Sequence, residues 1–407
     1  MISFLGILFL FGVAIALSSK RSSINWRTVG GAFAIQAILA CFVLYTSVGV
    51  DILNSITLFV QNIINYGTVG IEFVFGPLGN PGSERSLGFI FAFNVLPVII
   101  FFSSLISVLY HLKIMEFVIK IIGGGLNKLL QTSKPESMSA AANIFVGQTE
   151  APLIVKPFIS SMTRSELFAV MVGGLASVAG SIMAGYSSIG VELKYLLAAS
   201  FMAAPAGLMF AKILEPETGK PNQTLTDVKS NAEEFANVLD AAASGAASGM
   251  RLAVNVGAML LAFIALIAML NGVLGYVGGL FGYDTLTIQS LLGYVFQPVA
   301  WLIGVPWSEA QLAGSFIGQK IVINEFIAYS DFVGYMPELS VTSQAIITFA
   351  LCGFANLSSI AILLGGIGAM APNRRPDIAR LGLKAVLAAT LANLMSAALA
   401  GIFISLA

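Results

Sequence analysis

Two polar interruptions of the apolar chain repeat in the same order. Phe-Val-Gly-Gln at 145–148 is followed by Gly-Leu-Ala-Ser at 174–177, and Phe-Ile-Gly-Gln at 316–319 is followed by Gly-Phe-Ala-Asn at 353–356. The spacing between matching glycines is similar, from 147 to 174 and from 318 to 353. In a membrane protein, such repeats are typical of discontinuous helices that meet at a substrate site. Coincidence between Gly- and Ala-rich helices would have to produce four matching positions in each of two blocks.

The first interruption brings three different polar groups together. Gln148, Thr149 and Glu150 are adjacent, and Pro152 suits the first turn of a helix that restarts after them. Polar groups at membrane depth are costly unless paired, so they usually face a cavity. Glu150 could instead be a structural carboxylate that binds helix N-terminal N–H groups. Binding of a polar solute is favoured, because Gln148 and Thr149 have no comparable structural need.

The second interruption places a carboxylate at the start of a helix. Asn324 is a good N-cap, and Glu325 follows in the first turn, where the helix dipole favours a negative charge. Two interpretations remain open. Glu325 could pair with Lys320 at the rim, or its oxygens could accept hydrogen bonds from two hydroxyl groups of a sugar.

Small and polar residues also interrupt the spans that follow. Asn356 and Ser359 are three residues apart, so in one helix they would share a face. Asn143 and Ser177 offer two oxygen ligands to a hard cation, and the carbonyls of a broken helix can complete a sodium shell. The sequence has no His or Cys cluster, so we expect no transition metal and no cofactor.

The composition indicates an integral membrane protein. Of 407 residues, 57% are hydrophobic and only 10% are charged, against about 25% charged residues in soluble domains. The net charge is zero, so no nucleic acid partner is expected. Cys41 and Cys352 lie far apart in apolar stretches and suit packing. The apolar N-terminal stretch lacks a basic region before it, which predicts a first span rather than a cleaved signal peptide.

Eight segments are long and apolar enough to be predicted as spans, and three amphipathic segments are predicted to lie at the interface. The interfacial segments are 51–74, 114–130 and 289–303. The predicted spans are 2–17, 29–48, 89–109, 167–186, 195–213, 252–274, 345–369 and 383–406.

The distribution of basic residues predicts the orientation. If the N-terminus is outside, 17 of the 20 Lys and Arg residues fall on the inner side, and only Arg85, Lys194 and Lys320 fall outside. Both termini are then outside. Segment 138–160 must enter and leave from inside, and segment 309–331 from outside. The predicted fold is therefore an all-α polytopic membrane protein with eight transmembrane helices and two re-entrant helical hairpins of opposite polarity in an inverted repeat.

Three stretches resemble those of the concentrative nucleoside transporters. They are Gly-Gln-Thr-Glu-Ala-Pro-Leu at 147–153, Asn-Glu-Phe-Ile-Ala-Tyr at 324–329 and Cys-Gly-Phe-Ala-Asn-Leu-Ser-Ser-Ile at 352–360. The resemblance extends over essentially the whole chain, and the length is similar to the bacterial, eight-span members. It implies a homotrimer in the inner membrane that couples nucleoside uptake to a sodium or proton gradient.

The resemblance also assigns roles to residues. The base would contact Gln148, Thr149, Glu150 and Ile182. The ribose would bind Glu325, Asn356 and Ser359, with Phe354 packing against the nucleoside. Sodium would bind Asn143, Val146, Ser177 and Val178 through side chains and backbone carbonyls. Because both Asn143 and Ser177 match the sodium pattern, sodium is favoured over protons as the coupling ion.

The implied organisation separates a fixed scaffold from a moving, hairpin-bearing transport domain. Residues 1–110 hold scaffold helices, 111–213 the first repeat, 214–275 a cytoplasmic loop and a scaffold helix, and 276–407 the second repeat. A proton-coupled nucleoside carrier is the main alternative. A membrane-embedded enzyme using Glu150 and Glu325 lacks a nucleophile or metal cluster, and a channel would not need mixed recognition groups at its tips.

Overall fold

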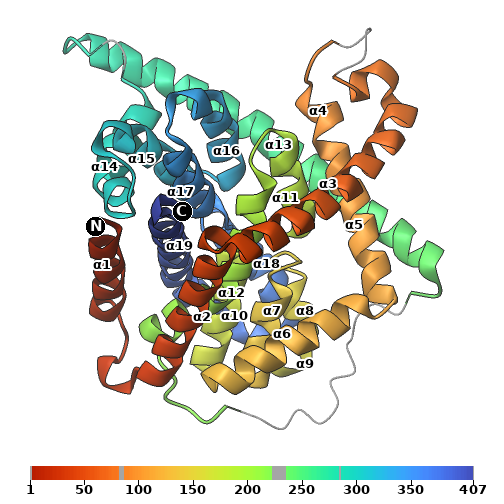
Figure 1. Cartoon of the computed structure of the whole chain (residues 1–407), viewed down its shortest axis with the longest axis vertical. Coiled ribbons are helices and arrows are strands. Elements are labelled where there is room, and N and C mark those ends of the chain that lie inside the picture. The colour runs from red at the N-terminus through yellow and green to blue at the C-terminus, as the bar shows by residue number, and fades with distance from the viewer. Residues whose placement is uncertain (1, 82–86, 222–234, 284–285, 407) are drawn as a thin grey trace.

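The computed structural model describes residues 2–81, 87–221, 235–283 and 286–406, and in these ranges the protein is built from helices without strands (Figure 1). Three helices form its centre: α10 (Arg164–Ala176), α12 (Leu193–Leu214) and α19 (Arg375–Leu406). In the most apolar part of the segment 164–188, which begins with α10, 94% of the residues are buried inside the protein. In the most apolar part of α13 (Val238–Gly279), only 11% are buried. The outer helices therefore present apolar side chains to their surroundings, as an all-α membrane protein requires.

The helices before the first interruption follow the predicted spans and interfacial segments closely. α2 begins with Asn25 as its N-cap, whose side chain accepts from the N–H groups of Arg27 and Thr28. α5 begins with Pro97 in its first turn, where the missing N–H costs nothing. The bounds are α1 (Ile2–Ala16), α2 (Trp26–Tyr45), α3 (Ser47–Phe75), α4 (Phe91–Asn94), α5 (Leu96–His111) and α6 (Ile114–Leu130).

The first repeat continues with short helices around the polar interruption. The predicted span 167–186 is broken at 177–179, between α10 and α11, as its glycines and serines indicated. The remaining bounds are α7 (Lys134–Ala142), α8 (Ala151–Ile154), α9 (Lys156–Ile159) and α11 (Gly180–Ser188). All four are shorter than the roughly 20 residues that a span needs.

The second repeat follows the long helix α13. Its first two helices, α14 (Ile288–Leu302) and α15 (Trp307–Val322), bend by 117° at the connection between them. The predicted span 345–369 is also broken, at 352–358. The other helices of this repeat are α16 (Glu325–Tyr335), α17 (Val341–Leu351) and α18 (Ser359–Met370).

Two helices differ from the predictions. α13 has 42 residues, about 63 Å, although only 252–274 was predicted as a span. Its first turns are rich in small residues and include Asp240 and Arg251, and Asn237 caps them, so hydropathy alone missed them. α3 is long and apolar enough to cross a membrane, although an interfacial position was predicted. Its mean hydropathy of 1.4 is the lowest of the seven such segments, which is compatible with that prediction.

Each polar interruption lies on a segment that turns back toward its starting side. At one end of the molecule, Glu136 of α7 pairs with Lys212 at 2.6 Å, and Arg374 donates to the Met162 carbonyl after α9 at 2.5 Å. In the second repeat, the Glu309 carboxylate near the start of α15 accepts from the Ser340 hydroxyl after α16 at 3.0 Å. In each repeat, the start and the end of this segment therefore lie at the same end of the molecule. α7–α9 lie low and α14–α16 high in Figure 1.

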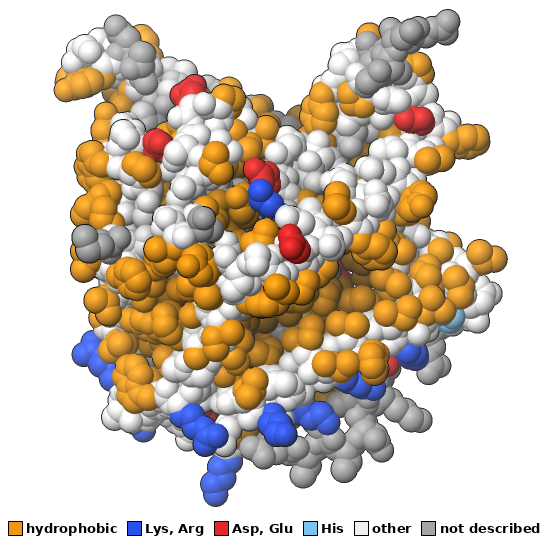
Figure 2. Space-filling view, in the orientation of Figure 1, with side chains coloured by type: hydrophobic (Ala, Val, Ile, Leu, Met, Phe, Trp, Pro, Cys, Tyr) orange, Lys and Arg blue, Asp and Glu red, His pale blue; other side chains and the backbone are white. Residues whose placement is uncertain are grey.

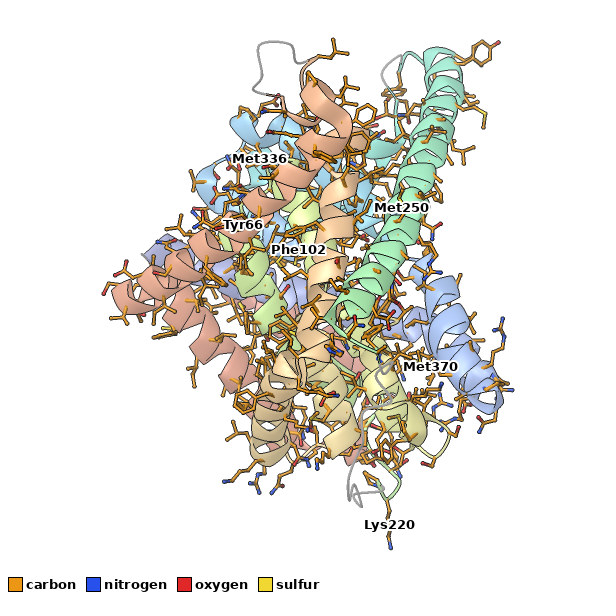
Figure 3. The ribbon with its side chains drawn as sticks, turned by 90° about the vertical axis from the view of Figure 1, so that its right-hand side faces the viewer. Tyr66, Phe102, Lys220, Met250, Met336 and Met370 are labelled. Carbon is orange, nitrogen blue, oxygen red and sulfur yellow. The ribbon has the colours of Figure 1, made fainter. Side chains whose placement is uncertain are left out.

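Basic side chains gather at the end of the molecule where α7 begins. Figure 2 shows Lys and Arg along that lower edge, below a broad apolar band. Figure 3 places Lys220 at this end and Met336 toward the opposite one. One predicted outer charge does not belong to either surface. Lys320 is only 1% exposed and lies inside the protein, while Arg85 lies outside the described residues.

Candidate functional site

The tip of the first repeat is an unwound stretch between two short helices. α7 ends at Ala142, residues 143–150 are not helical, and α8 begins at Ala151. Pro152 lies in the first turn of α8, as predicted. The stretch packs against the break after α10, where the Gly180 N–H donates to the Phe145 carbonyl at 3.0 Å. The two interruptions of the first repeat are therefore in direct contact.

The four residues expected to bind sodium lie together in this contact. Asn143, Val146, Ser177 and Val178 are all buried. A Cβ added at Gly173, in the last turn of α10, would lie 3.2 Å from Asn143 Nδ2, so the amide packs directly against that turn. Asn143 Nδ2 donates to the Ser139 carbonyl at 2.9 Å, whereas Oδ1 is buried without a hydrogen-bond partner. A buried, unpartnered oxygen is expensive, so this site fits a hard cation.

The tip of the second repeat is a sharp break of two residues. α15 ends at Val322 and α16 begins at Glu325, whose side chain is buried. Asn324 caps α16, because its Oδ1 accepts from the Ile327 N–H at 2.9 Å, as predicted. The alternative of a rim ion pair is wrong. Lys320 is buried and donates instead to the Ala350 carbonyl and to Asn393, at 2.8 and 2.7 Å.

A continuous chain of hydrogen bonds joins the two tips. Asn356 Nδ2 donates to Glu325 Oε2 at 2.9 Å, and Asn356 Oδ1 accepts from the Ser359 N–H at 2.9 Å. Gln148 Nε2 of the first tip reaches Ser359 Oγ at 3.4 Å. The proposed base and ribose residues of the two repeats thus meet between the tips.

The arrangement of Asn356 and Ser359 differs from the predicted shared helical face. Asn356 lies in the break, and Ser359 is the first residue of α18. The Asn356 side chain satisfies one of the free N–H groups of that helix, which turns its NH₂ toward Glu325. The two side chains therefore cooperate through a cap and not through helical periodicity.

The other predicted site residues lie around this chain without joining it. Thr149 is half-buried, and its Cγ2 would lie 2.9 Å from a Cβ added at Gly366 of α18. Ile182 of α11 is buried, and Phe354 in the second break is half-buried. Glu150 is exposed. It lines a cavity of about 360 Å³ that extends from the first tip between α5, α6 and α13.

Sequence reasoning missed two polar residues at the site. Tyr186 is fully buried, and its hydroxyl donates to Glu325 Oε1 at 3.0 Å. Asn393 of α19 donates to the carbonyl of Ala176, the last residue of α10, at 2.7 Å, and to the carbonyl of Cys352, the residue after α17, at 2.9 Å. Tyr186 lies one helical turn after Ile182, and Asn393 is an amide within a predicted span. These two sequence features could have indicated that Tyr186 and Asn393 have buried polar roles.

Comparisons with known proteins agree on one family. Models described as the N-terminus and C-terminus of Na⁺-dependent nucleoside transporters match residues 5–78 and 195–401, and a nucleoside recognition model matches 92–192. Nucleoside permease NupC of Helicobacter pylori is 50% identical over 412 residues, 99% of this chain and 98% of that protein. Solute carrier family 28 member 3 of Homo sapiens is 37% identical, over 100% of this chain and 60% of that protein.

Solved structures of similar proteins share the fold. The structure of CNTnw in an inward-facing, substrate-bound state is 58% identical, with a TM-score of 0.96 over 100% of this chain and 98% of that chain. A CNTnw variant in the intermediate 2 state, also 58% identical, gives a TM-score of 0.97 over 100% and 99% of the two chains.

Proposed function

Because the chain belongs to the Na⁺-dependent, concentrative nucleoside transporter family, we propose that it is a symporter that imports nucleosides with the inward sodium gradient. As a member of that family it is a nucleoside transporter and not an enzyme, so the alternative of an acid–base pair made of Glu150 and Glu325 is wrong. Sodium coupling and the residues that perform it are the parts that we propose.

The observation that carries the proposal is the hydrogen-bonded chain between the tips. Glu325 already accepts from Tyr186 and Asn356, one on each oxygen, and a carboxylate has about four acceptor positions. The remaining positions suit the two hydroxyl hydrogens of a ribose. Asn356 and Ser359 would hold the same diol, and Phe354 would pack against the nucleoside.

The base would lie on the first-repeat side of this chain. Gln148 contacts Ser359 at 3.4 Å, and its Oε1 is buried without a partner, so the amide retains hydrogen-bonding capacity for a base edge. Thr149 and Glu150 would supply further polar contacts, and Ile182 an apolar one. Mixed donors and acceptors beside apolar surface are typical of small-molecule sites.

Sodium would be co-transported at the contact of the first tip with the break after α10. Asn143 Oδ1 and the Ser177 hydroxyl, with backbone carbonyls at Val146 and Val178, form the proposed oxygen shell. The unpartnered Asn143 Oδ1 supports this assignment. Sodium there would connect the two interruptions of the first repeat, and one of these carries Gln148.

Transport would proceed by alternating access. The cavity lies between α5, α6 and α13 on one side and the first tip on the other, and Lys120 and Phe235 are among its lining residues. We propose that it is a route to the cytoplasmic side. The transport domain, 111–213 with 276–407, would move as a unit past a homotrimeric scaffold, 1–110 with 214–275. The chain would lie in a bacterial inner membrane with both termini outside, away from the basic end seen in Figure 2.

Uptake into proteoliposomes tests the coupling. An inward sodium gradient should accumulate labelled uridine, a proton gradient alone should not, and free uracil should hardly enter because it lacks the ribose. Uptake that follows the proton gradient and ignores sodium would favour the proton-coupled alternative and remove the proposed sodium site.

A further inference from the structure

Lys320 is a buried lysine that forms no close ion pair in the described part of the chain, although Glu325 interacts with it electrostatically over a longer distance. It is 1% exposed, and none of the ion pairs in the described part of the chain includes it. The other deeply buried lysine, Lys212, pairs with Glu136 at 2.6 Å. Removing an ammonium from water costs several kcal/mol unless other groups compensate. The position of Lys320 therefore requires a specific reason.

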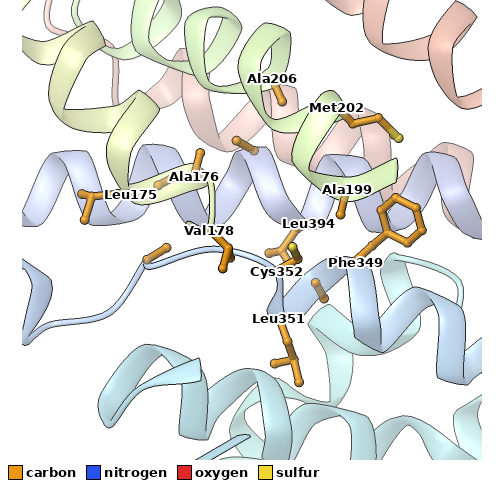
Figure 4. Packing of buried hydrophobic residues seen from close by; sticks show 14 of the residues in the cluster. Leu175, Ala176, Val178, Ala199, Met202, Ala206, Phe349, Leu351, Cys352 and Leu394 are labelled. Carbon is orange, nitrogen blue, oxygen red and sulfur yellow. The ribbon is translucent and has the colours of Figure 1, made fainter. Parts of the chain in front are cut away.

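The groups around its Nζ are the oxygens of a helix end and an amide. The ammonium donates to the Ala350 carbonyl in the last turn of α17, and to Asn393 Oδ1. The Asn393 NH₂ group donates to the carbonyls of Ala176 and Cys352. One network thus connects the C-terminal ends of α10 and α17, and Figure 4 shows Ala176 and Cys352 at these neighbouring ends beside α19.

The two repeats differ in where the helix before the break ends. α10 runs to Ala176, two residues past Gly174, whereas α17 stops at Leu351, two residues before the matching Gly353. The second helix therefore ends about one turn earlier relative to the repeat. The last carbonyls of a helix have no partners within it and carry partial negative charge. Lys320 and Asn393 satisfy such carbonyls in the second repeat.

The first repeat has no ammonium at the corresponding place. Thr149 occupies the position that matches Lys320, two residues after the repeated glycine. Near the end of α10, the buried Asn143 Oδ1 remains without a partner. The end of α17 thus has the ammonium of Lys320 beside it, whereas the end of α10 has Asn143 Oδ1, an oxygen that accepts no hydrogen bond.

We propose that Lys320 is a positioning residue that serves as the second repeat's own fixed cation. Its ammonium, with Asn393, holds the break at 352–358 so that Asn356 faces Glu325, whether or not the mobile cation occupies the first repeat. This inference rests on the proposed nucleoside site between the tips. It also requires that sodium acts through the first repeat alone.

The test measures equilibrium binding of uridine and of 2′,3′-dideoxyuridine, together with thermal stability, in purified transporter. Lys320→Met keeps the length of the side chain and removes the charge. Uridine affinity should fall about tenfold or more, and the preference for uridine over the dideoxy compound should fall with it. The melting temperature should also fall, because the Ala350 carbonyl and Asn393 Oδ1 lose their donor, so the loss of preference for uridine is the decisive result.

Two further variants separate this role from a merely structural one. Asn393→Leu should lose uridine affinity in the same way. Because the two residues act as a unit, the double variant should bind uridine as tightly as whichever single variant binds it more weakly. Lys212→Met is the matched control. It should melt at a lower temperature, because Glu136 is left unpaired, but it should keep the parent's preference for uridine.

The outcomes distinguish the inference from the proposed function. A parent that binds both compounds equally would remove the ribose site itself. A parent that discriminates, with Lys320→Met discriminating equally well, would overturn the positioning role. Additive losses in the double variant would overturn the connection through Asn393.

Discussion

The two repeat tips carry matching four-residue motifs, 145–148 and 316–319, in different local structures. In the first, residues 143–150 are unwound and expose side-chain and backbone groups of several kinds. In the second, the helix continues to Val322, and only two residues separate it from Glu325. Gln148 reaches across to Ser359, whereas its counterpart Gln319 donates to Asp331 within its own hairpin at 2.7 Å. Matching sequence therefore does not imply matching function.

This difference indicates a division of labour between the tips. The second tip presents one carboxylate in a fixed position, because Asn324 caps α16, and Lys320 and Asn393 donate to the carbonyls at the end of α17. Gln319 Oε1 is its one buried side-chain oxygen without a partner among the described residues. The first tip retains unpartnered oxygens at Asn143 and Gln148. We infer that the second tip recognises the constant part of the substrate, and that the first responds to the cation and to the base.

The largest expected effect is at the second tip. Glu325→Ala should weaken uridine binding by more than about a hundredfold, because hydrogen bonds to a charged group contribute about 1.5–3 kcal/mol each. Tyr186→Phe is the companion variant. It removes only one donor to the same carboxylate, so its loss should be smaller. Isothermal titration with uridine measures both, and a Glu325→Ala protein that binds as tightly as the parent would exclude Glu325 as the ribose anchor.

The second break, at 352–358, should tolerate an added side-chain carbon less well than the helix that follows it. A Cβ at Gly353 would collide with Asn393 Oδ1 and would lie 2.8 Å from the Ala176 carbonyl. Gly353→Ala should therefore destabilise the protein by about 1–3 kcal/mol and weaken uridine binding. Gly365→Ala in α18 is the control, since nothing lies within 4 Å of its added Cβ. Equal melting temperatures for the two variants would contradict the tight packing of this break.

The first tip should separate sodium from substrate. Asn143→Ala removes the unpartnered oxygen, so the sodium concentration for half-maximal uridine binding should rise about tenfold, while affinity at saturating sodium changes little. Asn143→Asp keeps the oxygen and should remain responsive to sodium. An unchanged sodium requirement in Asn143→Ala would place the cation elsewhere.

The smallest expected effect concerns the base. Gln148→Ala should change the ranking of uridine, cytidine and adenosine by a few-fold, because the amide takes part in only one long hydrogen bond in the free site. Gln319→Ala, the matching change in the second repeat, should leave the ranking unaltered. Competition binding with the three nucleosides measures it, and a uniform loss for all three would assign Gln148 to folding or gating.

Much of this comparison could be predicted from local sequence, and the rest could not. The cap at Asn324, the proline in the first turn of α8, the breaks after α10 and α17, and the helical class follow from residue types that act within a few positions. The contact of Gln148 with Ser359 joins residues 211 positions apart, and that of Lys320 with Asn393 joins residues 73 apart. No periodicity encodes such pairs, so Lys320 was misplaced at the rim and Asn393 was overlooked.

The central claim is that one sodium, bound at the first repeat, favours nucleoside binding between the tips. Linkage makes this directly measurable, because two coupled ligands must raise each other's affinity by the same factor. In purified transporter, sodium should raise uridine affinity, and uridine should raise sodium affinity equally, with a sodium Hill coefficient of about one. Uridine affinity that is independent of sodium would contradict the account, and a coefficient near two would contradict the assignment of Lys320 as the second repeat's fixed cation.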